Sequence, residues 1–355
     1  MIVISYGRDA AESAYAALAA SDINAYLKRG METAIKPNLV VPCPASAGAT
    51  THPGVVEGII RYLKDFGITK LKIIESTSVG GSTKKAYKYC DYEEMAAKYG
   101  VPLIDLKDDG ATTLRHGDMK IDVCNEALNA DFLINAPVLK GHSQTRMTCC
   151  MKNLKGCVPD SEKRRFHSLG IHKPVAALNM LLKTGYCVVD GICGDLSFEE
   201  GGNPVEANRI IVGRNPLTVD SYCAELIGYR PDDIGYISYG KQMGVGEYYS
   251  LESAPLELNA ENKPLHAGGT GRIAEKYEAV IDEDAACSAC YSSLVFALHK
   301  LKKPISGEKI HIGQGFKGKG GSGVGVGNCA SGFATRAPGC PPKAADIIEM
   351  LATLK

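Results

Sequence analysis

Short runs of β-branched residues alternate with longer helical patterns over the first 245 residues of this 355-residue chain. Such alternation is typical of βα units that build a parallel sheet. The predicted strands cover residues 1–5, 33–37, 71–74, 101–104, 131–135 and 186–190. The predicted helices cover residues 10–28, 55–66, 84–99, 175–183 and 219–227. The sequence therefore predicts an α/β fold with a doubly wound, mainly parallel sheet.

The pattern changes after residue 245, which predicts three units along the chain. Residues 1–245 form the α/β domain, and residues 246–280 lose all periodicity, as expected of a connecting insertion. Residues 281–355 contain four cysteines, many glycines and a final helical pattern over residues 344–354. We therefore expect a small C-terminal domain with its own chemistry.

Composition excludes several classes of protein. The formal net charge of +0 argues against a general nucleic-acid binder. The apolar start Ile2-Val3-Ile4 lacks the basic leader of a signal peptide, and no stretch reaches the roughly 18 apolar residues of a membrane span. We therefore expect a cytoplasmic protein with no membrane partner. Thirteen cysteines in a reducing compartment then indicate metal ligation, catalysis or burial and not a disulfide framework.

The cysteines of the tail have the spacing of a metal site. Cys287 and Cys290 form a C-x2-C pair before a helical run, and Cys329 and Cys340 follow. Four thiolates suit zinc or an iron-sulfur cluster. Ten residues separate the second pair, unlike in a zinc ribbon, and a proline after the last ligand is typical of cluster sites. The sequence favours one [4Fe-4S] cluster, with structural zinc or unmetallated buried cysteines as the alternatives.

The residues around these cysteines support a cluster. Pro341 and Pro342 would open the final helix, which would place Cys340 at a helix N-terminus where a thiolate is stabilised. The glycine-rich segment 313–327 would let main-chain N–H groups approach the sulfurs.

A second, looser group of cysteines lies in the middle of the chain. Cys149, Cys150 and Cys157 could ligate a metal together with His142 or His167. Adjacent cysteines on a helix, however, point about 100° apart and rarely share one ion. We therefore interpret this group as buried core residues.

The segment from Lys140 to Lys173 has eight cationic residues and only two acidic ones, which predicts a local field that attracts an anion. Its Lys163-Arg164-Arg165 run is interpreted as a solvated face. Because ligands of open α/β sheets bind at the carboxyl ends of the strands, polar residues there are candidate site residues. They are Lys36, Asn38, His52, Glu75, Ser76, Lys140, His142, Lys152, Asn153, Lys155, Asp190 and, with less support, Asp220. Each also has a structural interpretation, and for His52 this is a plain helix N-cap.

Several motifs together resemble a known family, the domain of unknown function 362. They are Ile35-Lys36-Pro37-Asn38-Leu39-Val40, Ala49-Thr50-Thr51-His52-Pro53, Met151-Lys152-Asn153-Leu154-Lys155-Gly156-Cys157, Val189-Asp190-Gly191-Ile192 and Val219-Asp220. Residues 310–318 with Gly339-Cys340-Pro341-Pro342 resemble the iron-sulfur tail of a subset of that family. Many such relatives have a two-cluster ferredoxin segment, whereas only four tail cysteines fit here. The resemblance implies an α/β domain and one cluster, and it leaves the reaction open.

A fainter similarity is to the nickel-dependent lactate racemase group. The order of Lys155-Gly156-Cys157-Val158-Pro159 followed by His167 or His172 is similar to a lysine that carries a pincer cofactor followed by a metal-binding histidine. The flanking residues differ, so nickel is not predicted. The similarity supports a site on the same loop.

Three functions fit these features. In the first, an iron-sulfur enzyme reduces or rearranges a small anionic substrate. Lys36, Lys140, Lys152 and Lys155 then stabilise negative charge, His142 or His52 donates the proton, and Asp190 orients a lysine or binds a cation.

The second is a ferredoxin-like protein that passes electrons to a redox partner and has no substrate of its own. The third is a non-redox isomerase or lyase with a structural cluster. The fragility of such a cluster suggests an anaerobic setting.

Overall fold

The main sheet of this computed structural model has eight strands, of which only one runs against the others. The structure describes residues 1–250, 252–264, 273–301 and 309–354. Across the sheet the order is β12 (Leu256–Leu258), β1 (Ile2–Tyr6), β11 (Pro204–Gly213), β10 (Tyr186–Asp195), β7 (Phe132–Ala136), β2 (Glu32–Pro37), β3 (Lys70–Glu75) and β4 (Leu103–Asp105). All pairings except those of β11 are parallel. The predicted α/β fold with a mainly parallel sheet is confirmed.

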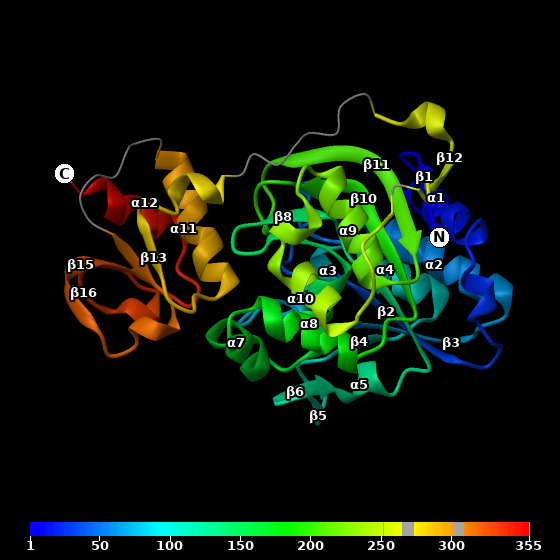
Figure 1. The fold of residues 1–355 in the computed structure, drawn as a ribbon, viewed down its shortest axis with the longest axis horizontal. Helices are drawn as coiled ribbons and strands as arrows, with labels where there is room; N and C mark the ends of the chain where they lie inside the picture. The colour runs from blue at the N-terminus through cyan, green and yellow to red at the C-terminus, as the bar shows by residue number, and fades with distance from the viewer. Residues whose placement is uncertain (251, 265–272, 302–308, 355) are drawn as a thin grey trace.

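Helices cover both faces of this sheet (Figure 1). Successive residues of a strand point to opposite faces. Accordingly, Val3 belongs to one hydrophobic core and its neighbours Ile2 and Ile4 belong to the other. The first core is closed by α1 (Ala10–Ala19), α2 (Pro53–Phe66), α3 (Thr83–Tyr89) and α4 (Tyr92–Tyr99). The second is closed by α5 (Asn125–Leu128), α6 (Cys150–Asn153), α7 (Asp160–Ser168), α8 (His172–Leu181), α9 (Pro216–Leu226) and α10 (Gly235–Met243).

Some predicted elements differ from the structure for local reasons. The single helix expected over residues 84–99 is two helices, because Asp91 takes a left-handed backbone with φ of 62° between α3 and α4. The antiparallel strand β11 was not predicted. The hairpin of β5 (Ala111–His116) and β6 (Met119–Cys124) was also missed, because its strands are half-exposed and polar.

The predicted insertion 246–280 is not wholly irregular. Its strand β12 pairs in parallel with β1 and extends the edge of the main sheet. Residues 251 and 265–272 of this segment lie outside the described residues. The boundaries of the three expected units stay a prediction.

The tail builds a second sheet with a separate core. Its four strands are all parallel in the order β13 (Ile281–Glu283), β14 (Ile310–Ile312), β15 (Gly320–Val326) and β16 (Gly332–Ala337). Helices α11 (Ser288–Leu301) and α12 (Ala344–Ala352) pack with them around a third hydrophobic core. Figure 1 shows the tail in orange and red beside the larger part, at the side where α7 and the loop around β8 (Lys140–His142) lie.

The helix boundaries in the tail correct two expectations. Helix α12 begins at Ala344 after the N-cap residue Lys343, so Pro341 and Pro342 precede the helix and Cys340 is not at its N-terminus. Helix α11 begins at Ser288, so Cys290 lies inside its first turn.

Candidate functional site

A cavity of about 100 Å³ lies at the carboxyl ends of β2 and β3, where the tail meets the larger part. The polar residues that line it are Lys36, Asn38, Glu75, Ser76, Thr77, Ser78, Thr148, Lys152, Asn153, Lys155, Lys163, His167, Glu199, Glu200, Cys287 and Ser288. Eight of the residues predicted as site residues are therefore brought together here: Lys36, Asn38, Glu75, Ser76, Lys152, Asn153, Lys155 and Cys287.

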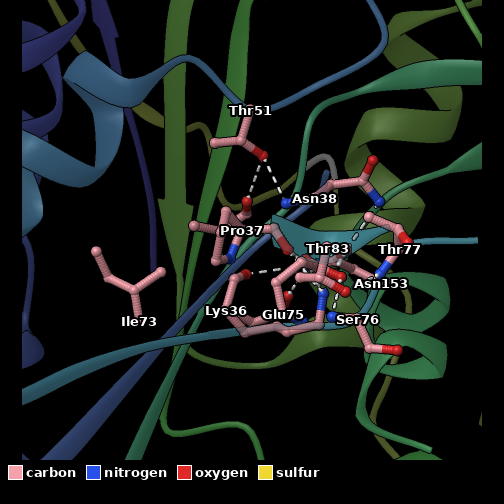
Figure 2. A network of polar contacts seen from close by, with 12 residues as sticks. Lys36, Pro37, Asn38, Thr51, Ile73, Glu75, Ser76, Thr77, Thr83 and Asn153 are labelled. Atoms are coloured by element: carbon pink, nitrogen blue, oxygen red, sulfur yellow. Dashed lines mark hydrogen bonds and ion pairs between the residues drawn. The ribbon is translucent and has the colours of Figure 1, made fainter. Parts of the chain in front are cut away.

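One wall is a buried polar network from the ends of two neighbouring strands (Figure 2). Lys36 Nζ donates to Glu75 Oε2 at 2.6 Å, and both side chains are buried. Asn153 Oδ1 accepts from Asn38 Nδ2 at 2.9 Å, while Asn153 Nδ2 donates to the carbonyl oxygen of Lys36. Ser76 donates its backbone N–H to Glu75. These bonds fix the ends of β2 and β3 against the last residue of α6.

A second wall is organised by Glu199, which the sequence analysis did not single out. Its Oε1 accepts from Lys152 Nζ at 3.2 Å, and its backbone carbonyl accepts from Lys140 Nζ at 2.8 Å. Burial raises the pKa of Glu199, but the contact with His142 and the positive charges of Lys152 and Lys140 outweigh it and hold this pKa well below its usual range. Burial lowers the pKa of Lys140 to about 8.

His142 lies behind Glu199 and outside the residues that line the cavity. Its Nδ1 accepts the backbone N–H groups of Gln144 and Thr145, so the neutral ring keeps its proton on Nε2. That Nε2 lies 2.9 Å from Glu199 Oε2, although it is not aligned as a hydrogen bond. Burial lowers the pKa of His142 to about 4. The ring is therefore neutral near pH 7 and lies in contact with Glu199.

The third wall contains a lysine without a carboxylate partner. Lys155 Nζ lies 2.7 Å from His167 Nε2, and within the described residues no carboxylate forms an ion pair with it. Burial, followed by the charge of Lys152, lowers the pKa of Lys155 to about 7. Burial and the charge of Lys155 hold the pKa of His167 well below its usual value. Lys155 is thus free to take up an anion as its counter-ion.

Two more charged residues complete the cavity. Lys163 is buried and donates to Ser76, to the carbonyl oxygen of Thr77 and to Asp160, so its interpretation as part of a solvated face was wrong. Burial and the charge of Glu199 raise the pKa of Glu200 to about 7. A carboxyl and an amine that both titrate near neutral pH therefore line one cavity.

Neither His52 nor Asp190 lines the cavity. His52 is the N-cap of α2, and its Nδ1 accepts the backbone N–H of Gly54. Asp190 accepts the backbone N–H groups of His52 at 2.7 Å and Ile192 at 2.9 Å. Burial raises the pKa of Asp190 to about 6, and these two bonds oppose that effect. The structural interpretation of both residues fits these contacts, and neither contacts a lysine of the cavity.

The variant Asp190→Asn tests this assignment. An asparagine oxygen can replace only one of the two accepted bonds, so we expect a loss of about 1–3 kcal/mol in the free energy of unfolding. Urea denaturation followed by circular dichroism measures it. Because Asp190 does not line the cavity, the variant should bind a probe anion such as acetate there as the wild type does, and a large loss of affinity would return Asp190 to the site.

The four tail cysteines surround a smaller cavity of about 20 Å³. Cys287, Cys290, Cys329 and Cys340 line it together with glycines from the predicted glycine-rich segment. Burial raises the pKa of Cys290 to about 12, followed by the charge of Cys287. Cys287 lines both this cavity and the larger one.

The distances between these sulfurs limit which metal group the four cysteines could hold. In a tetrahedral zinc site, Zn–S distances of about 2.3 Å place the sulfurs about 3.8 Å apart. Among the described residues, no three tail sulfurs lie within 4.8 Å of one another. Four thiols around one cavity can serve as ligands of a metal group.

Sequence reasoning missed Lys163, Glu199 and Glu200, and considered His167 only as a possible metal ligand. Lys163 and His167 are four residues apart, so the i, i+4 rule would have placed both on one face of α7. Glu199 and Glu200 lie in the loop between β10 and β11, where the sequence has no periodicity to interpret.

Over 255 residues the chain is 24% identical to the thylakoid-associated protein sll1697 of Synechocystis, which covers 68% of this chain and 78% of that protein. Among solved structures, the lactate racemase apoprotein of Thermoanaerobacterium thermosaccharolyticum aligns with a TM-score of 0.42 and 12% identity, over 63% of this chain and just over half (56%) of the racemase chain. This overlap is too low to support an inference about this protein.

In the part of the chain that the structure describes, no helix is long and apolar enough to cross a bilayer. The model of the family called domain of unknown function (DUF362) matches residues 33–225, which is more than half of the chain and includes the motifs that line the cavity. The chain belongs to the DUF362 family.

Proposed function

We propose that this protein is an iron-sulfur enzyme that reduces or rearranges a small anionic substrate in the cation-lined cavity. The observation that carries the proposal is the position of Cys287, which lines both the substrate cavity and the cavity surrounded by the other three tail cysteines. Cys287, Cys290, Cys329 and Cys340 would hold one [4Fe-4S] cluster. When bound, such a group supplies single electrons.

The residues of the chain have distinct roles in this proposal. Lys155 binds the anionic group, because it has no carboxylate partner among the described residues, while Lys152 and Lys163 add positive potential. The network of Lys36, Glu75 and Asn153 holds the opposite wall rigid. Protons are exchanged at Lys155 Nζ, since groups that titrate near neutral pH suit this task. His142 and His52 are set aside as proton donors, because neither lines the cavity.

The test is an anaerobic purification followed by iron and sulfide analysis and electron spin resonance of the reduced protein. We expect about four iron atoms and four sulfides per chain. Acetate, lactate or phosphate should change the spin-resonance signal of the wild type. The variant Lys155→Met should keep its iron and lose this response. Zinc in the tail in place of iron, or a signal that no anion alters, would overturn the proposal.

A non-redox isomerase or lyase with a structural cluster is the second candidate. The presence of both Glu200 and Lys155 on one cavity favours it, because groups with pKa values near 7 can transfer protons without electrons. Turnover that is the same with an oxidised and a reduced cluster, yet lost in Lys155→Ala, would select this function over the first.

Anion binding should also depend on pH in the protein prepared without iron. The charged form of Lys155 attracts the anion, and burial lowers its pKa to about 7. Acetate binding should therefore weaken as the pH rises above about 7, and binding above that pH should take up a proton. Calorimetric titrations in buffers of different ionisation enthalpy measure this uptake. Binding that is constant from pH 6 to 9 would contradict the role of Lys155.

A further inference from the structure

Four cysteines and one aspartate meet in the core beneath α6, away from the tail. Cys149 and Cys150 lie at the start of α6, Cys187 lies on β10, and Asp220 and Cys223 lie on α9. All five are fully buried. The side chain of Cys223 interacts with Cys149, and that of Cys187 interacts with Cys150. We refer to these five residues as the core thiol cluster.

The aspartate of this cluster is a buried acid without a cation. Asp220 Oδ1 accepts the backbone N–H of Cys150 at 2.7 Å, and Oδ2 accepts that of Met151 at 2.9 Å. Among the described residues, no lysine, arginine or histidine forms an ion pair with it. A carboxylate buried without a cation costs several kcal/mol. Two backbone hydrogen bonds offset part of this cost, and a positive ion beside the carboxylate would offset the rest.

The donor atoms have the spacing that a zinc ion requires. The Sγ atoms of Cys149 and Cys150 are 3.8 Å apart, which is about the sulfur separation in a tetrahedral zinc site. A carboxylate oxygen of Asp220 and these two sulfurs all lie within 4.8 Å of one another. Cys223 follows Asp220 by three residues on the same helix, so it reaches the same side and provides a fourth donor.

The backbone conformation of Cys149 allows two adjacent cysteines to bind the same ion. The expectation that adjacent cysteines rarely share one ion assumed that both residues are helical, so that their side chains diverge by about 100°. Cys149 instead has φ of −153° and ψ of −145°, which is not helical, and only Cys150 begins the helix. Both sulfurs can therefore face one point. Cys157, the third member of the group expected from the sequence, is buried but is not among these donors.

We propose that the core thiol cluster binds one zinc ion through Cys149, Cys150, Cys223 and Asp220. Binding would release the thiol protons of the three cysteines and supply the missing counter-ion of Asp220. The two backbone bonds to Asp220 would orient its carboxylate, as is usual for carboxylate ligands. The site is closed on all sides and therefore structural. It would fix α6, whose residues Lys152 and Asn153 line the substrate cavity.

The experiment is a zinc analysis of the purified full-length protein after dialysis against a chelator, which strips exposed sites. We expect about one zinc per chain in the wild type. After the same dialysis, the variants Cys149→Ser and Cys223→Ser should each contain no more than about one tenth of the zinc found in the wild type. Cys157→Ser is the matched control, because it removes an equally buried thiol outside the cluster, and it should keep its zinc.

Two further measurements keep the outcome decisive if a variant folds poorly. Cobalt added to the wild type during refolding should give the visible absorption of a tetrahedral thiolate site, and Cys329→Ser should not alter it. A wild type without zinc, or zinc that stays in folded Cys149→Ser, would overturn the proposal. Zinc lost only in Cys329→Ser would place the ion in the tail, which also contradicts the iron-sulfur function. A missing tail cluster with zinc still bound at the core thiol cluster would overturn only the iron-sulfur function.

Discussion

The variant Lys155→Met should bind acetate or lactate about 10- to 100-fold more weakly than the wild type. Within the described residues the polar partner of Lys155 is His167 and not a carboxylate, so we expect its ammonium group to form a charge-assisted hydrogen bond with the anion. Such a bond contributes about 1.5–3 kcal/mol, which corresponds to this range of affinities. Methionine keeps most of the apolar length of the side chain and removes the charge. Isothermal titration calorimetry on folded protein measures the loss.

The matched control is Lys173→Met, which removes a charge from the same basic segment. Lys173 is exposed and does not line the cavity. If the binding energy comes from a direct contact, this variant should bind acetate like the wild type at physiological salt, where exposed charges are screened. Equal losses in both variants would show that the anion responds to the general field of the segment and would remove Lys155 from the binding role.

Three of the predicted residues that line this cavity share one property. Lys36 and Glu75 lie at the carboxyl ends of buried parallel strands and Asn38 directly follows one, and such strand ends meet at one edge of the sheet. The hydrophobic runs fix those strands, so the position of the next polar residue follows from the chain alone. The same rule failed for Asp190, because β10 continues to Asp195 and Asp190 lies inside the strand.

The parts that were missed depend on contacts between distant segments. Lys163 belongs to a run of three cations that looks solvated, and it is buried only because the loop after β3 offers carbonyl oxygens to its ammonium group. The position of Glu199 depends on Lys140 and Lys152, which are more than 45 residues away in the chain. No periodicity encodes such contacts. Cys287 and Lys155 likewise line the same cavity only because the tail packs on the larger part of the chain.

The variant Glu199→Gln should lose about 3–5 kcal/mol of the free energy of unfolding. This residue pairs with Lys152 and lies beside His142 in a buried setting, and removing one partner of such a group leaves an uncompensated buried charge. Glutamine has nearly the same shape, so the loss reports the charge and not a cavity. Urea denaturation at pH 7, followed by circular dichroism, measures the difference from the wild type.

The stabilisation of the fold by Glu199 should depend on pH. Because the pKa of Glu199 is held well below its usual range, its stabilisation is complete above the ordinary value for unfolded glutamate, about 4.3, and is lost as the pH falls through the lower pKa of the folded protein. The difference between Glu199→Gln and the wild type should therefore shrink in acid.

Glu200→Gln should behave in the opposite way. Burial and the charge of Glu199 raise the pKa of Glu200 to about 7, so its ionised form opposes folding above that pH. Removing this carboxyl should leave stability unchanged or higher at pH 8. If both variants lost the same stability at pH 7, the two adjacent glutamates would be electrostatically equivalent, and Glu199 could not be the charge that holds Lys152 in the wall of the cavity.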